Sequence, residues 1–104
     1  MASEKEQELL QEVKNHLRIT WDDEDDEISS IIARGKSRLT GLAGPDLLFK
    51  RESLERDLLL NYCRYAYNNA LEYFEDSFHR EIVRLQLQEA VKDYAEQKRP
   101  QEDS

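Results

Sequence analysis

The fold is decided by residues 9–44, which read LLQEVKNHLRITWDDEDDEISSIIARGKSRLTGLAG. Apolar side chains in this stretch recur at steps of three and four residues, the spacing of one face of an α-helix. A run of six acids from Asp22 to Glu27 divides the stretch into two such periodic segments. The sequence therefore predicts a helix, an acidic corner and a second helix.

The first helix is expected over residues 4–18. Ser3 and Glu6 form the S-x-x-E pattern of a capping box, in which each side chain caps the backbone of the other. Either Asp22 or Asp23 is expected to cap the second helix. The acids that follow suit its first turn, because the N-terminal end of a helix dipole is positive.

Glycines mark the rest of the second helix. Gly35 lies on the apolar stripe, where glycine costs about 1 kcal/mol relative to alanine. Close packing of another helix is the expected compensation. Gly41 is expected to end the helix. Residues 40–50, TGLAGPDLLFK, are expected to form the longest loop, since Gly44-Pro45-Asp46 is a turn signal.

The remaining sequence predicts two more helices, over residues 52–74 and 78–95. No segment has the two-residue period of a strand. The expected fold class is all-α, a small bundle of about four helices with one longer loop between the second and third. Residues 1–97 are expected to form a single domain, and residues 98–104 a polar, disordered tail.

Charge is unevenly distributed along this chain of 104 residues, whose formal net charge is −8. Residues 1–27 carry ten acidic and three basic side chains, whereas residues 28–56 carry three acidic and six basic ones. A free DNA-binding surface is normally basic, so the balance argues against nucleic acid as the primary partner. The separation of charge would suit a head-to-tail contact between identical subunits.

No residue pattern predicts catalysis, a cofactor or a metal site. His16 and His79 have no second histidine at helical spacing, and Cys63 is the only cysteine, as expected in a reducing compartment. The acidic run lacks the central glycine of an EF-hand loop, so helix capping and a solvated surface explain it better. No apolar run approaches 18 residues, so no membrane segment is expected.

Three segments together resemble the head–tail connector proteins of phages and prophages of Gram-positive bacteria. They are EVKNHLRI, DDEDDEISSIIARGKSRLTGLAG and LLLNYCRYAYNNALEYFEDSFHREIVRLQLQ, and the resemblance covers roughly residues 9–90. It implies a ring beneath the portal protein that extends the DNA channel, with DNA as cargo only. A stopper or tail-completion protein would be the next partner. The resemblance also implies a location in the virion, reached from the host cytoplasm, and it allows a monomer before assembly.

The charge pattern, exposed aromatics and apolar loop together give a hypothesis for the protein interface. Its residues are Trp21, Asp22, Asp23, Asp25, Asp26, Arg34, Lys36, Arg38, Leu47, Leu48, Phe49, Lys50, Arg51, Tyr65 and Tyr73. The competing hypothesis is a small acidic cytosolic regulator or adaptor, including a DNA mimic, that binds a basic protein. Genomic neighbours encoding portal, protease and capsid proteins would favour the connector.

Overall fold

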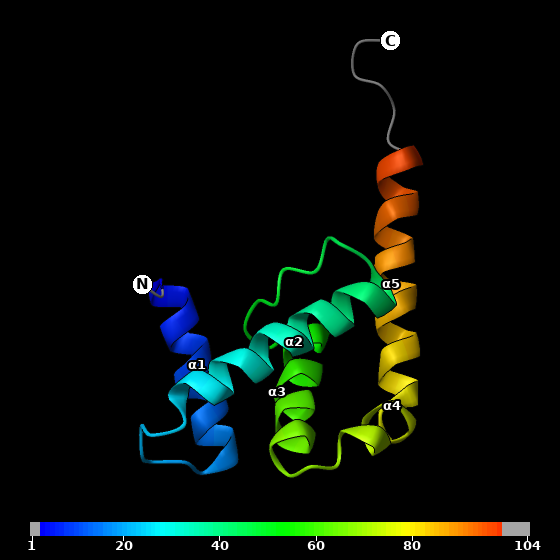
Figure 1. Ribbon diagram of the computed structural model, residues 1–104. Helices are drawn as coiled ribbons and strands as arrows, with labels where there is room; N and C mark the ends of the chain where they lie inside the picture. The colour runs from blue at the N-terminus through cyan, green and yellow to red at the C-terminus, as the bar shows by residue number, and fades with distance from the viewer. Residues whose placement is uncertain (1–2, 99–104) are drawn as a thin grey trace.

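The computed structural model describes residues 3–98, which contain five α-helices, one 3₁₀ turn and no strand (Figure 1). The elements are α1 (Glu4–Leu17), α2 (Asp25–Ala43), α3 (Leu54–Tyr67), η1 (Leu71–Tyr73), α4 (Phe74–Ser77) and α5 (His79–Lys98). The all-α prediction is confirmed. The expected number of about four helices is wrong by one, because the chain breaks where the third helix was expected to continue.

Helix α2 organises the molecule. It contacts α1 near its beginning, packs along α3 through its centre and meets α5 near its end (Figure 1). Helices α1 and α5 do not contact each other and lie at opposite ends of a body measuring 57 × 33 × 19 Å. The core lies between these helices, and its fully enclosed side chains include Val13, Ile28, Leu39, Leu58 and Phe74. The two ends of the molecule are thus left with separate surfaces.

The start of α1 agrees with the prediction from the sequence, whereas the start of α2 differs from it. The capping box between Ser3 and Glu6 is present. Helix α2 begins at Asp25, with Glu24 at the N-cap position and no side-chain cap, so the predicted cap at Asp22 or Asp23 is wrong. The Asp22 carboxylate instead accepts a hydrogen bond from Lys14, at 2.5 Å.

Two glycines of α2 act differently from each other. An alanine Cβ at Gly35 would lie 2.7 Å from Leu59 Cδ1 and 2.8 Å from Tyr62 Cδ1, so the expected close approach of another helix is confirmed. The predicted end at Gly41 is wrong, because the helix continues to Ala43. Gly44 ends it with a φ of 129° that glycine adopts readily, and Pro45 cannot extend the helix.

The expected helix over residues 52–74 is wrong as a single element, because it stops at Tyr67. Asn69 takes a φ of 57°, a left-handed conformation that asparagine tolerates, and the chain reverses. The reversal brings Phe74 edge-on to Tyr62, with ring centroids 5.4 Å apart. Burial of Phe74 compensates for the lost helical turns. The helix expected over residues 78–95 is found as α5, which continues through Lys98, the first residue of the predicted tail; residues 99–104 lie outside the described residues.

Candidate interaction surfaces

The acidic corner, Trp21 to Glu27 between α1 and α2, is built around a buried lysine. The Lys14 side chain is only 4% exposed, and its Nζ lies 2.5 Å from Asp22 Oδ1 and 2.8 Å from Asp25 Oδ1. Hydrogen bonds to these two carboxylates raise the pKa of Lys14 above its ordinary value. Two acids of the expected interface are therefore paired within their own chain, and they hold the start of α2 against α1.

Glu24 fixes the aromatic side of the acidic corner. Its Oε1 accepts hydrogen bonds from Tyr67 Oη at 2.6 Å and from Trp21 Nε1 at 3.2 Å. The bond to this carboxylate raises the pKa of Tyr67, because the phenolate would be repelled by it. The Trp21 ring remains 47% exposed. A large apolar side chain is thereby oriented at the surface, among acids.

Asp23, Asp26 and Glu27 are the acids of this corner that are left for a partner. Their side chains are exposed, and none of them forms a hydrogen bond or an ion pair with the residues that the structure describes. They flank Trp21 and the start of α2. The corner therefore presents an apolar side chain with uncompensated negative charge beside it.

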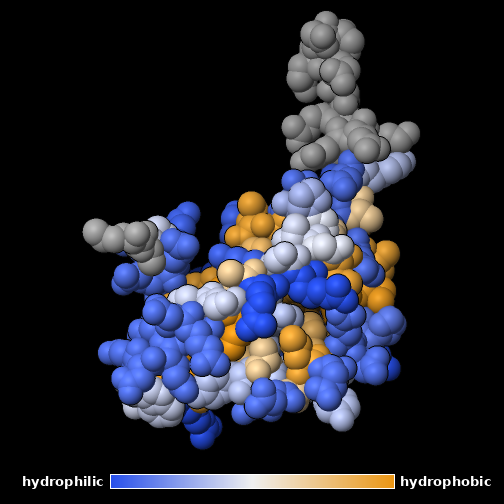
Figure 2. Space-filling model, viewed as in Figure 1, coloured by the Kyte–Doolittle hydropathy of each residue, from blue (hydrophilic) through white to orange (hydrophobic). Residues whose placement is uncertain are grey.

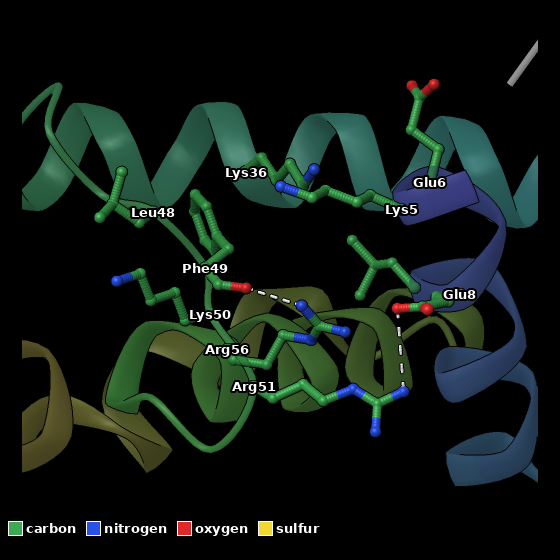
Figure 3. Close-up of a pocket in the computed structure, with 10 residues that line it drawn as sticks. Lys5, Glu6, Glu8, Lys36, Leu48, Phe49, Lys50, Arg51 and Arg56 are labelled. Atoms are coloured by element: carbon green, nitrogen blue, oxygen red, sulfur yellow. Dashed lines mark hydrogen bonds and ion pairs between the residues drawn. The ribbon is translucent and has the colours of Figure 1, made fainter. Parts of the chain in front are cut away.

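A second surface, the basic loop surface, surrounds a cavity of about 310 Å³ between the start of α1, α2 and the loop at residues 44–53 (Figure 3). Its lining residues are Lys5, Glu6, Glu8, Leu9, Lys36, Leu48, Phe49, Lys50, Arg51 and Arg56. Leu48 is 64% exposed. Lys36 Nζ lies 5.8 Å from the centre of the Phe49 ring. Lys5 and Lys50 have no carboxylate partner among the described residues, so this surface is apolar and positively charged.

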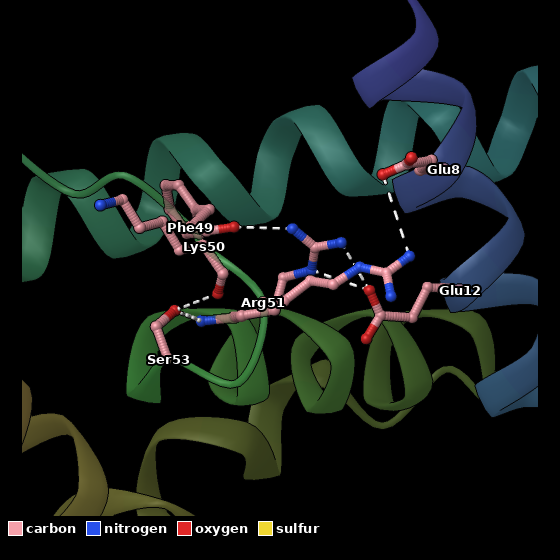
Figure 4. A network of polar contacts seen from close by, with 7 residues as sticks. Glu8, Glu12, Phe49, Lys50, Arg51 and Ser53 are labelled. Atoms are coloured by element: carbon pink, nitrogen blue, oxygen red, sulfur yellow. Dashed lines mark hydrogen bonds and ion pairs between the residues drawn. The ribbon is translucent and has the colours of Figure 1, made fainter.

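Arg56, which Figure 3 labels, anchors the loop that forms the basic surface, and Figure 4 shows the network of polar contacts there. Its guanidinium donates to Glu12 of α1, at 2.5 and 2.9 Å, and to the carbonyl oxygen of Phe49 at 2.6 Å. Arg51 is held only weakly, 3.9 Å from Glu8. Phe49 has a φ of 53°, which is strained for an aromatic residue. The loop is therefore fixed to both α1 and α3.

The remaining residues of the expected interface are scattered. Arg38 forms an ion pair with Glu75 at 2.5 Å, and Arg34 is exposed. Leu47 is buried in the core. Tyr65 is half-buried, edge-on to Phe74 and Phe78, whereas Tyr73 is 60% exposed. The structure thus brings together the acidic corner as one group and the loop residues as another.

The interface predicted from the sequence did not name Lys14, Arg56 or any residue on the outer side of α5. Lys14 lies one turn after Leu10, so a charge near the apolar stripe of the first helix was the available signal. In α5, apolar residues occur at more positions than one buried face can hold. Val83, Leu87 and Val91 are consequently exposed, at 36%, 62% and 65%.

Searches of the described part of the chain give no other type of site. Residues 3–98 contain no group of three or more histidine, cysteine or acidic side chains that could hold a metal ion. In the same range, every helix is too short or too polar to cross a lipid bilayer. Cys63 is buried, and desolvation raises the pKa of its thiol to about 12. Its side chain is therefore a poor nucleophile.

Comparison with known proteins supplies the family. The model of the family described as phage gp6-like head-tail connector protein matches residues 7–103. No curated protein and no solved structure gives a significant match. Proteins of that family are structural rather than enzymatic. Since the match covers almost the whole chain and agrees with the all-helical fold, this protein belongs to the phage gp6-like head-tail connector family and is a structural protein of a phage head–tail junction.

Proposed function

We propose that this chain is a connector subunit that assembles as a ring beneath the portal protein. The ring would extend the DNA channel and receive the stopper or tail-completion protein. The observation that best supports this is the separation of two incomplete surfaces. The acidic corner and the basic loop surface lie at opposite ends of α1, about 20 Å apart at 1.5 Å per residue.

Each surface retains charge that its own chain does not neutralise. Asp23 and Asp26 lack a basic partner among the described residues, and Lys5 and Lys50 lack an acidic one. Each surface also exposes one large apolar side chain, Trp21 or Leu48. Apolar anchors beside complementary charge are typical of specific protein contacts. We therefore propose that these surfaces bind a neighbouring subunit or the portal.

DNA would pass through the ring as cargo. The chain carries a net charge of −8, and an acidic channel wall would not retain the phosphates through basic side chains. No cofactor or membrane is part of this function. The subunit would join the virion from the host cytoplasm, and it would be free to remain monomeric until the portal orders it.

Reconstitution on portal-bearing capsids that lack the chain tests the proposal. The parent protein should bind them and increase the fraction of particles that retain DNA and accept tails. Asp23→Lys should reduce binding while leaving the protein folded, and Lys50→Glu in the same chain should partly restore it. The matched control is Asp76→Lys, an exposed acid of α4 far from both surfaces.

Added salt should weaken docking of the parent, because exposed charges are screened over about 8–10 Å at ordinary ionic strength. Leu48→Ala should weaken docking at every salt concentration, since its contribution is buried apolar area. If the parent protein binds no portal-bearing capsid and rescues no DNA retention, the proposed function is wrong.

A further inference from the structure

Helix α5 carries an apolar ridge that the body of the protein does not use. Ile82, Leu85 and Glu89 face the core, whereas Val83, Leu87 and Val91 recur every four residues on the opposite side. Figure 2 shows hydrophobic surface along the outer edge of this helix. Single exposed apolar residues are ordinary. Three aliphatic side chains aligned along one outward face indicate a contact with another molecule.

A groove with matching properties lies at the other end of the molecule. It has a volume of about 250 Å³ between α1 and α2, and it is lined by Glu6, Gln7, Leu9, Leu10, Ser29, Ile32, Ala33 and Lys36. Its floor is apolar, because Leu9 and Ile32 form it. Ser29 and Ala33 are small and exposed, so they leave room for larger side chains of an approaching helix.

We propose that the α5 ridge of one subunit docks into the α1–α2 groove of a second copy of this chain. This inference rests on the proposed function, and it adds an apolar contact between neighbouring subunits to the charged contacts proposed above. With the two helices parallel, Leu87 faces Ser29 and Val91 faces Ala33. The two pairs can form at the same time, because Leu87 and Val91 are four residues apart on α5 and Ser29 and Ala33 are four residues apart on α2.

Charge fixes the same register and direction. Arg84 lies three residues before Leu87, and Asp26 lies three residues before Ser29. Both charges are exposed, and neither has an ionic partner among the described residues. Asp26 therefore meets Arg84 of the neighbour when Leu87 enters the groove. An antiparallel approach would place Arg84 near Lys36 at the far end of the groove and would be repulsive.

The geometry favours a second copy over a contact within the chain. Helices α1 and α5 lie at opposite ends of the molecule and do not touch. A ridge at one end and its groove at the other form a heterologous contact, which repeats from subunit to subunit and closes into a ring when the rotation allows. A contact through three aliphatic side chains is small beside a stable complex, which buries roughly 800 Å² and about 20–30 residues on each partner. The contact is therefore weak between free subunits and gains strength from ring closure.

Cysteine cross-linking tests the register. A chain carrying both Ala33→Cys and Val91→Cys, at high concentration and with a short bismaleimide, should give a ladder of covalent multimers. The native Cys63 can remain, because it is buried and its raised pKa of about 12 keeps it unreactive. The matched control replaces Ala33→Cys by Ser30→Cys, which is exposed on α2 outside the groove, and it should give at least fivefold less ladder.

Second-site changes separate a specific contact from random collision. Added to the Ala33→Cys/Val91→Cys chain, Leu87→Lys should reduce the ladder at least fivefold. Arg84→Glu should also reduce it, and Asp26→Lys in the same chain should restore it. Equal ladders from the test and control pairs, or a ladder unaffected by Leu87→Lys, would overturn the inference.

The proposed function fails separately. A specific ladder from a protein that never binds portal-bearing capsids would support the ridge-and-groove contact and refute the connector proposal. Conversely, the Ala33→Cys/Val91→Cys chain could give no specific ladder while particles made with Leu87→Lys retain DNA normally. That result would refute the ridge-and-groove contact and leave the connector proposal standing.

Discussion

Replacing Gly35 by alanine measures how tightly α2 and α3 are packed. The new Cβ would lie 2.7 Å from Leu59 Cδ1 and 2.8 Å from Tyr62 Cδ1, well inside van der Waals contact. Leu59 is fully buried, and Tyr62 is held edge-on against Phe74, so neither side chain can move aside freely. Overpacking of this kind costs about 1–3 kcal/mol. The better helix propensity of alanine offsets about 1 kcal/mol.

We therefore expect Gly35→Ala to lower the free energy of unfolding by about 1 kcal/mol, and Gly35→Leu by about 3 kcal/mol, since leucine adds three more carbons at a closed site. Urea titration followed by circular dichroism measures both. The matched control is Gly41→Ala in the same helix, because nothing lies within 4 Å of a Cβ there. The control should stabilise the protein by about 0.5–1 kcal/mol.

Both alanine variants gain the same helix propensity. If Gly35→Ala lowers the free energy of unfolding and Gly41→Ala raises it, the α2–α3 contact is the cause of the difference. If Gly35→Ala stabilises the protein as much as Gly41→Ala does, the packing argument is wrong. In thermal unfolding, 1 kcal/mol corresponds to about 4–8 °C for a domain of this size, so the difference is easily measured.

Three further predictions concern groups that the fold buries. Lys14→Met should lower the melting temperature at pH 7. The pKa of Lys14 is raised in the folded state, so protonated Lys14 stabilises the fold. The difference in melting temperature between parent and variant should therefore be full below the ordinary lysine pKa of 10.5 and shrink as the pH rises through the raised pKa. An undiminished difference at pH 12 would contradict this. Arg56→Met should lower the free energy of unfolding by about 1.5–3 kcal/mol, because Glu12 and the Phe49 carbonyl lose a charged donor. An unchanged urea titration would show that Arg56 does not hold the loop. Cys63 should resist iodoacetamide in the folded protein and react with it in urea, which mass spectrometry can show. Replacing His16, His79 or Cys63 by alanine should leave virion assembly intact if the variant folds.

The all-α fold could be predicted because its signals are local. The capping box of Ser3 and Glu6 and the apolar period of α2 depend on residues three or four apart, and those contacts form within one helix. Gly35 was also informative from sequence, since a glycine on an apolar stripe has few explanations other than close packing. The separation of acidic and basic segments is likewise a property of the chain itself.

Contacts between distant segments decided the rest. Asn68-Asn69 could have continued a helix, but the reversal there buries Phe74 against Tyr62. The acidic run looked like a uniform solvated surface, yet the position of Lys14 divides it into paired and unpaired carboxylates.

By itself, the sequence determined that this is a helical protein with charge divided along its length, because periodicity and composition do not depend on which distant segments come into contact. Only the tertiary structure decided which apolar face of α5 enters the core and which stays outside. That choice depends on where α2 and α3 lie in space, since burial is a property of the packed molecule and not of the helix.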